Sequence, residues 1–174
     1  MFSVVSTRFN NDTWSENQEN RRRRNVQCLY GSPQEMSPKI DYNSTVFVVE
    51  MNNSVNEITG IGLIKNTPRL QKYYNIHSDG NFNRYAYFGK YHITRNLLME
   101  YNEPLVFALD HILFKEKTHL KRGAGFTTIP EKLMNHKVCQ GINIKKEIKD
   151  IFLSHFLTQP EARQIDTNIT EIIA

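Results

Sequence analysis

The order of hydrophobic and polar positions predicts several strands in the first half of the chain. Residues 2–7 are rich in β-branched side chains, as in a half-buried strand. Two apolar runs, residues 45–51 and 58–65, flank the turn-forming sequence NNSVNE, and together they predict a β-hairpin. Residues 84–89 alternate in the same way and predict a further strand.

Helical spacing of apolar residues occurs in two segments of the second half. Residues 104–114 and 144–157 repeat apolar side chains at intervals of three and four, as on one face of an amphipathic helix. Another helix is predicted near the N-terminus, because Thr13 and Glu16 have the spacing of a capping box. Trp14 then lies in the first turn of this helix, and four consecutive arginines, residues 21–24, follow along it.

Polar segments with turn-forming residues separate these elements. Residues 30–43 contain one glycine and two prolines and predict a loop. Residues 66–82 are polar and bear tyrosines, and residues 115–130 form a basic, glycine-bearing connection. Residues from 159 onward lack a strong pattern, and we expect a peripheral or frayed tail.

Two glycines refine the predicted architecture. Gly60 and Gly62 alternate with apolar residues in the second hairpin strand, so one face of that strand lacks side chains. This pattern is typical of a strand that bends in a barrel or that another group approaches closely. The predicted fold class is therefore α+β, a small curved sheet or open β-barrel with helices packed around it. Residues 1–157 form a single domain in this prediction, and residues 158–174 form the tail.

Composition narrows the functional classes. The 174 residues are 39% hydrophobic and 11% aromatic, as in a globular protein, and the net charge of +4 permits a polyanionic partner without requiring one. Cys28 and Cys139 stand alone, which favours a reducing compartment over a disulfide scaffold. The sequence shows neither a signal peptide nor an apolar run that would span a bilayer. We expect a cytoplasmic protein, with a nuclear location as the alternative.

The order of these motifs resembles a known superfamily. A strand, a helix that opens with Trp14-Ser15, a run of arginines, the strand sequence VFVVEMNN and the strand sequence ITGIGLIKN follow the order of PUA-like domains. The YTH and EVE branches are the most similar, and NFNRYAYFGK corresponds to a later strand of YTH domains. The resemblance covers residues 2–89. The composition, rich in Asn and Lys, also resembles that of proteins of large cytoplasmic DNA viruses.

This resemblance implies a nucleic-acid-binding protein that flips one base into an aromatic cage. The base in such domains is typically methylated, such as N6-methyladenine in RNA. Trp14 matches one wall of the cage, and Ser15 matches a residue whose backbone contacts the base edge. Tyr73 or Tyr74 is available where YTH domains have a second tryptophan.

The residue chemistry agrees with single-strand recognition, with RNA favoured over DNA. An unstacked base needs an aromatic surface, and stacking contributes about 1–3 kcal/mol. Thr7, Asn11 and Asp12 lie just before Trp14 and offer hydrogen bonds to a base edge. Cations for the flanking phosphates are supplied by Arg21, Arg22, Arg23, Arg24, Arg84, Lys117, Lys121 and Arg122. We expect no cofactor, no metal and no membrane partner.

Each of these assignments has a structural alternative. A single tryptophan is often a core residue, and Tyr73 and Tyr74 are equally suited to covering a sheet edge. Two of the arginines have the spacing to pair with Glu16 and Glu19. The glycines of residues 121–125 fit either a phosphate-holding loop or the end of a helix.

Two other functional classes stay open. A metal-dependent nuclease would draw its general base or ligands from His77, Asp79, His92, Asp110, His111 and His119. The sequence has no nucleophile elbow, phosphate-binding loop motif or zinc-protease motif, so we do not expect an enzyme. A protein-interaction module would use the apolar helix faces around Val106 and Ile151. The sequence leaves the oligomeric state open.

Overall fold

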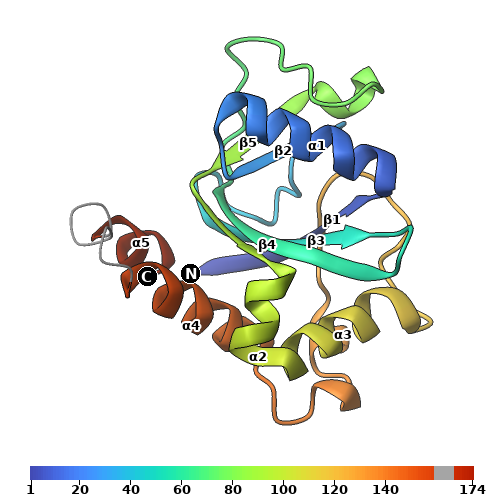
Figure 1. Ribbon diagram of the computed structural model, residues 1–174, viewed down its shortest axis with the longest axis vertical. Coiled ribbons are helices and arrows are strands. Elements are labelled where there is room, and N and C mark those ends of the chain that lie inside the picture. Colours follow the sequence, from blue (N-terminus) through green and yellow to red (C-terminus); the bar gives the residue numbers. More distant parts are fainter. Residues whose placement is uncertain (159–166) are drawn as a thin grey trace.

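A mixed five-stranded sheet forms the centre of the protein, in the order β6-β4-β3-β1-β7 (Figure 1). The computed structural model describes residues 1–158 and 167–174. Strand β1 pairs in parallel with β3, and the other neighbours are antiparallel. The strands are β1 Phe2–Phe9, β3 Thr45–Asn52, β4 Glu57–Lys65, β6 Tyr91–Thr94 and β7 Thr127–Thr128.

A second sheet has two strands, β2 Cys28–Ser32 and β5 Tyr85–Gly89. The parallel pairing of β1 with β3 requires a crossover, and the chain makes it through helix α1 (Asn11–Arg24) and strand β2. Helix α1, β2 and β5 lie on one side of the central sheet (Figure 1). The central sheet does not close into a barrel, because β6 and β7 lie at its two edges. The combination of this sheet with packed helices agrees with the predicted α+β class.

Both faces of the central sheet are covered, so strand β3 is buried along its whole length. Because successive side chains of a strand point to opposite faces, β3 sends Phe47 to one core and Val48 to the other. The first core packs against α2 (Arg95–Asp110), α4 (Ile144–Leu157) and α5 (Thr167–Ile173). The second packs against β2 and β5 and includes Tyr30 and Tyr87.

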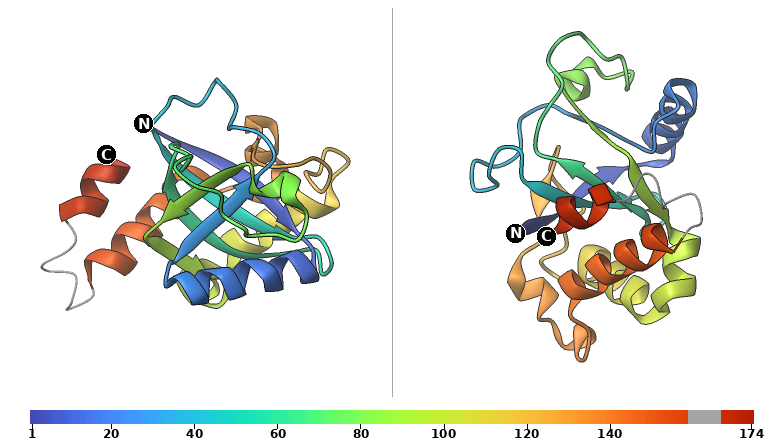
Figure 2. Two further views of the ribbon diagram at one scale, coloured as in Figure 1. Left: turned by 90° about the horizontal axis from the view of Figure 1, so that it is seen from above. Right: turned by 90° about the vertical axis from the view of Figure 1, so that its left-hand side faces the viewer.

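Helices α2 and α4 lie on the side of the sheet opposite to α1 (Figure 2). Short helical segments complete the chain: η1 Gly80–Asn83, the π-helix η2 His111–Lys115, α3 Glu131–Met134 and η3 Lys137–Cys139. No helix within residues 1–158 or 167–174 has both the length and the apolar character of a membrane span.

The predicted hairpin and helix 144–157 are confirmed, whereas other boundaries differ. The predicted loop 30–43 begins with three residues of strand β2, and strand β6 had no prediction. Helix α2 begins nine residues before the predicted position 104, because it continues across a break at Asn102 (φ −159°, ψ 85°), just before Pro104. Of the predicted tail, residues 159–166 lie outside the described part, and α5 is a helix with Ile169 and Ile173 buried.

The start of α1 also differs from the prediction. Strand β1 runs on to Phe9, and Asn10 caps the helix: its side chain accepts a hydrogen bond from the Thr13 N–H at 2.8 Å. The Thr13 hydroxyl oxygen accepts from the Asn10 N–H at 2.9 Å, so the capping box is Asn10–Thr13 rather than Thr13–Glu16. Glu16 therefore takes no part in capping α1.

Gly60 and Gly62 have the close-approach role that the sequence predicts. A Cβ on Gly60 would lie 2.7 Å from the carbonyl oxygen of Ile93, and one on Gly62 would overlap the hydroxyl of Tyr30. At Gly60 the neighbouring strand β6 approaches β4 closely, and at Gly62 strand β2 does, so a side chain at either position would push these elements apart.

Candidate functional site

A pocket of about 500 Å³ lies where the end of β1, the first turns of α1 and the loop before η1 meet. Its lining comes from segments far apart in the chain: residues 7–10, residues 77–79 with Phe82, and residues 123–125. A larger hollow, about 790 Å³, lies along residues 131–145, but no Phe, Tyr or Trp lines it. Of these two, the pocket at the end of β1 is therefore the better candidate for a flat aromatic ligand.

Three rings form an aromatic wall in this pocket. Phe9 ends β1, and its ring centroid lies 6.3 Å from that of His77. His77 in turn lies 6.4 Å from Phe82, with the two ring planes inclined by 76°. All three residues line the pocket, but Phe9 and His77 are only 5% and 6% exposed, so the accessible ring surface comes mainly from the half-buried Phe82.

A carboxylate lies beside this wall. Glu16 accepts a hydrogen bond from Nδ1 of His77 at 3.0 Å, and it accepts others from the N–H and hydroxyl of Ser78. Burial raises the pKa of Glu16, but the hydrogen bonds from Ser78 and His77 outweigh burial, and the pKa lies below its ordinary value. Glu16 is thus ionised at neutral pH, and it fixes the orientation of the His77 ring.

The basic loop, residues 115–125, borders the same pocket. Arg8 holds its second half: the guanidinium donates to the carbonyl oxygens of Leu120 at 3.1 Å and Gly125 at 2.8 Å. Gly123 and Gly125 line the pocket with positive φ angles of 111° and 69°, which favour glycine. The helix preceding the loop ends at Lys115, so these glycines do not cap a helix, and that alternative is excluded.

Of the predicted base-contacting residues, Thr7 and Asp12 line the pocket. The indole of Trp14 does not: it packs edge-on against Phe9 at 5.1 Å and joins the second core from a half-buried position. Trp14 therefore supports a wall residue from behind, and Phe9 takes the place in the pocket that the sequence assigned to the tryptophan.

The other predicted base-contacting residues also lie outside the pocket. Asn11 accepts a hydrogen bond from Asn52, and Ser15 is exposed on α1. Tyr74 is buried and packs on Phe88 at 5.0 Å, while Tyr73 is exposed and accepts a hydrogen bond from Asn83. The alternative, that these tyrosines cover a sheet edge, fits Tyr74, which packs on Phe88 of the edge strand β5.

Arg21 does not lie where a phosphate contact would require it. It is buried, and its guanidinium donates to Oε1 of the buried Glu50 at 2.7 Å. Tyr30, Thr59 and Nε2 of His92 also hydrogen-bond this carboxylate. The prediction for Arg21 is wrong because adjacent residues of a helix point in different directions, and position 21 points at the sheet.

The pKa values of this buried group reflect the pairing. Burial raises the pKa of Glu50, but the charges of Arg21 and His92 outweigh burial, so the carboxyl pKa lies well below its ordinary value. Burial likewise lowers the pKa of Arg21, but Glu50 outweighs it and raises that pKa above its ordinary value. The group is a charged, hydrogen-bonded link between α1 and the sheet, although Nε of Arg21 is buried without a partner.

The other arginines of the run differ in their contacts. Arg22 pairs with Glu19 at 2.6 Å, as predicted, whereas Glu16 pairs with His77 rather than with an arginine. Arg23 donates to the side-chain oxygen of Asn20 at 2.8 Å. Arg24 lies over the ring of Tyr74, 5.4 Å from its centroid. The run also places four positive charges in the last turn of α1, where the helix dipole favours them.

The remaining predicted phosphate contacts are accessible. Arg84, Lys117 and Arg122 are exposed and Lys121 is half-buried. Within residues 1–158 and 167–174, none of these four lies within 4.0 Å of an acidic side chain. Lys121 and Arg122 immediately precede the glycines that line the pocket, so the loop brings unpaired cations close to the aromatic wall.

No model of a known protein family, no curated protein and no solved structure matches the chain. The function must therefore be argued from the pocket and the basic loop beside it.

Proposed function

We propose that this protein binds single-stranded nucleic acid, RNA in preference to DNA, and holds one unstacked base in the pocket beside Phe9. The observation that carries the proposal is that ring surfaces, an ionised carboxylate and a basic loop meet at one pocket. Recognition of single strands combines stacking surfaces, hydrogen bonds to base edges and cations for the backbone.

The dimensions and polarity of the pocket support a base as its ligand. Its volume, about 500 Å³, lies within the range of roughly 300–1,000 Å³ that small-molecule sites occupy. Glu16 accepts hydrogen bonds only, so it favours a base edge that presents an amino group. N6-methyladenine retains one such N–H, and its methyl group would contact the rings of Phe9 and Phe82. A modified adenine is therefore the base we favour.

Membership of the PUA-like superfamily, which the sequence resembles, is part of the same proposal. The order of β1, α1, β2 and the β3–β4 hairpin agrees with a PUA-like domain of the YTH or EVE type. In this chain the walls would be Phe9, His77 and Phe82 rather than tryptophans. Smaller rings offer less stacking area, so we expect modest selectivity for methylation.

The test is a titration of short single-stranded RNAs that are identical except for one N6-methyladenine, followed by fluorescence anisotropy. Phe82 is half-buried, so Phe82→Ala removes wall surface without emptying the core. We expect the variant to lose about 1–3 kcal/mol of binding free energy, the contribution of one stacked base. Phe88→Ala is the matched control, because Phe88 is also half-buried but packs on Tyr74 away from the pocket. Unchanged affinity in a folded Phe82→Ala protein would contradict the proposal.

Hydrolysis by the His77–Glu16 pair is the second candidate. A histidine oriented by a carboxylate is a common arrangement for a general base. Neither cysteine is a suitable nucleophile, since burial raises the pKa of Cys28 to about 12 and also raises that of Cys139. Cleavage of labelled RNA or DNA in the presence of Mg²⁺, lost in His77→Ala, would establish this class. Binding without cleavage would leave the first proposal standing.

A further inference from the structure

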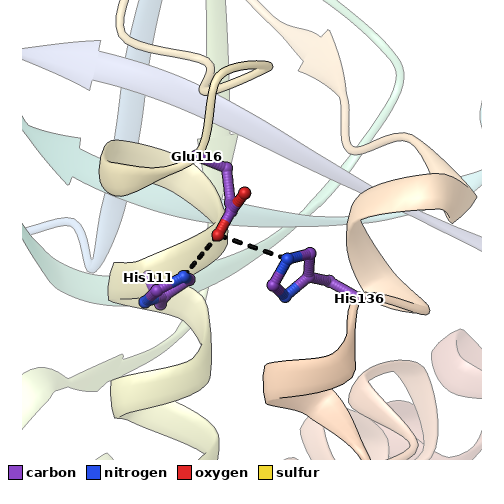
Figure 3. Close-up of side chains that lie close together, drawn as sticks. All are labelled: His111, Glu116 and His136. Atoms are coloured by element: carbon purple, nitrogen blue, oxygen red, sulfur yellow. Dashed lines mark hydrogen bonds and ion pairs between the residues drawn. The ribbon is translucent and has the colours of Figure 1, made fainter.

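Two histidines and a glutamate meet where η2 leads into the basic loop (Figure 3). None of the three lines the aromatic pocket. Nε2 of His111 and Nε2 of His136 lie 2.5 and 3.2 Å from the same oxygen, Oε1 of Glu116. The two imidazole centroids are 5.6 Å apart, with their planes inclined by only 30°. One potential ligand atom from each residue lies within 4.8 Å of the other two.

The local backbone explains why His111 and Glu116 meet. They are five residues apart, whereas side chains on one face of an α-helix are three or four apart. Residues His111–Lys115 form a π-helix, whose wider turn bonds residues five apart, and Glu116 leaves it in an extended conformation. π-Helical turns are frequent at functional sites. His136 arrives from a separate segment, as the N-cap of η3.

We propose that His111, Glu116 and His136 bind a divalent transition metal of the zinc type, with water at the remaining position. Two imidazoles and one carboxylate are borderline ligands that suit zinc, and three protein ligands with an open position are typical of non-structural zinc sites. The proposal is independent of nucleic-acid binding, because none of the three residues lines the aromatic pocket.

The side chains have the freedom to close around an ion. Zinc holds nitrogen and oxygen ligands at about 2.0–2.2 Å, so two ligands of one tetrahedral ion lie about 3.4 Å apart. The 2.5 Å contact between His111 and Glu116 must therefore lengthen to admit the ion, while the 3.2 Å contact between His136 and Glu116 already has nearly this length. The side chains of His111, Glu116 and His136 are 36%, 27% and 22% exposed, so small rotations meet little packing resistance. Hollows on both sides, one lined by His111 and the other by His136, give water access to the open position.

Metal binding changes the hydrogen bonds of His136. Its Nδ1 accepts from the N–H of Val138 at 3.2 Å, so Nε2 of the neutral ring carries the proton and donates it to Glu116. Coordination through Nε2 transfers the ring proton to Nδ1 by way of solvent and gives up this cap. One hydrogen bond to an exposed backbone segment is a small loss beside a metal–imidazole bond. The positive charge of Lys137 near Glu116 opposes a cation, so we expect micromolar rather than nanomolar affinity.

The experiment is a calorimetric titration of the chelator-treated 174-residue protein with Zn²⁺. We expect one ion per chain in the parent and an affinity at least about 100-fold lower in His111→Ala and His136→Ala, because each loses a ligand. His155→Ala is the matched control, since His155 lies on α4 outside the cluster, and it should bind Zn²⁺ as the parent does. Zn²⁺ should also raise the melting temperature of the parent and of the control, but not of the two ligand variants.

Glu116→Gln is a third ligand variant, in case the two alanine variants fail to fold. It keeps the size of the side chain and removes its negative charge. Loss of Zn²⁺ binding in this folded variant would support the site. Absence of stoichiometric binding in the parent, or parent-like binding in any ligand variant, would overturn the proposal. The three residues would then form a hydrogen-bonded cluster that joins the end of α2 to η3 without a metal.

Discussion

At the scale of single residues, Trp14 shows how the same side chain can suit two environments. The sequence places it beside polar residues in the first turn of a helix, which fits a cage wall. In the structure the indole lies between Phe9 and Arg21, with the guanidinium 5.3 Å from the ring centroid. Trp14 packs there because it lies on the side of α1 that faces the second core.

We therefore expect Trp14→Ala to affect stability more than binding. The indole is half-buried, so the loss should be about 2 kcal/mol, less than the roughly 3–5 kcal/mol of a fully buried tryptophan. Urea unfolding followed by circular dichroism measures the loss, and RNA anisotropy measures the affinity of the remaining folded protein. A fully stable variant that has lost RNA binding would return Trp14 to the wall of the site.

Glu50 links the central sheet to α1 through the buried Arg21. Glu50→Gln leaves the buried Arg21 without a counter-charge, and breaking a buried pair in this way costs about 3–5 kcal/mol. Glu19→Gln is the matched control, because Glu19 pairs with an arginine of the same helix at an exposed position and should change stability little. Equal unfolding free energies for the two variants would show that the buried link contributes nothing.

The same carboxylate predicts a pH dependence. The pKa of Glu50 in the folded protein lies below the ordinary value of 4.5, so ionisation of Glu50 stabilises the folded state relative to the unfolded state. This contribution is complete above about pH 4.5 and is lost as the pH falls toward the lowered folded pKa. The free energy of unfolding, measured from pH 7 to pH 3, should therefore fall less steeply in Glu50→Gln than in the parent. Parallel curves would contradict the assignment.

At the scale of elements, periodicity identified the segments whose pattern is long and regular. The β3–β4 hairpin and α4 were predictable because each repeats its apolar positions over at least seven residues between clear turn signals. Strands β2 and β6 have five and four residues and adjoin loop-like sequence, so a local pattern cannot identify them. Asn10 was overlooked as the cap of α1 because β1 is two residues longer than its β-branched core indicated.

The candidate site was less accessible to sequence reasoning than the fold. Thr7 and Asp12 were predictable as polar residues next to a strand end, and the basic loop was evident from its charge. Phe9 and Phe82 are 73 positions apart, and they meet because β2 pairs with β5 and Glu16 of α1 bonds His77 and Ser78 in the loop before β5. Tertiary contacts of this kind leave no periodic signal in one sequence.

Gly62 provides a test at the scale of elements. Its missing Cβ lets the Tyr30 hydroxyl and the Cys28 sulfur lie directly against β4. Gly62→Ala should separate these layers and cost about 1–3 kcal/mol, the usual penalty of overpacking. Gly80→Ala is the matched control, because a Cβ there would meet only the Tyr73 hydroxyl at an ordinary distance of 3.5 Å. Equal melting temperatures for the two variants would remove the close-approach role from Gly62.

At the scale of the whole molecule, the distribution of charge matters more than its sum. A net charge of +4 is small for 174 residues, and much of the positive charge of α1 is already compensated by Glu50 and Glu19. Four cations of the basic loop, Lys115, Lys117, Lys121 and Arg122, have no acidic partner within the described residues. Long-range attraction of a polyanion should therefore depend on the loop rather than on the arginine run.

Salt dependence of RNA binding separates these two sources of charge. Each phosphate contact on a single strand contributes about −0.7 to the slope of log affinity against log salt, through counterion release. Replacing both Lys121 and Arg122 with alanine should flatten the slope by about 1.4, since two contacts are lost. The loop backbone should stay in place, because Asn53 binds the carbonyl of Lys121 rather than its side chain.

The control for this measurement is Arg22→Ala, which removes an exposed cation that is already paired with Glu19. Its slope should match that of the parent, because a guanidinium held by a carboxylate displaces few counterions from RNA. If Arg22→Ala flattens the slope and the loop variant does not, the strand crosses α1 and not the pocket rim. The base would then have no route from the bound backbone to Phe9, and the proposed position of the nucleic acid would be wrong even though the protein binds it.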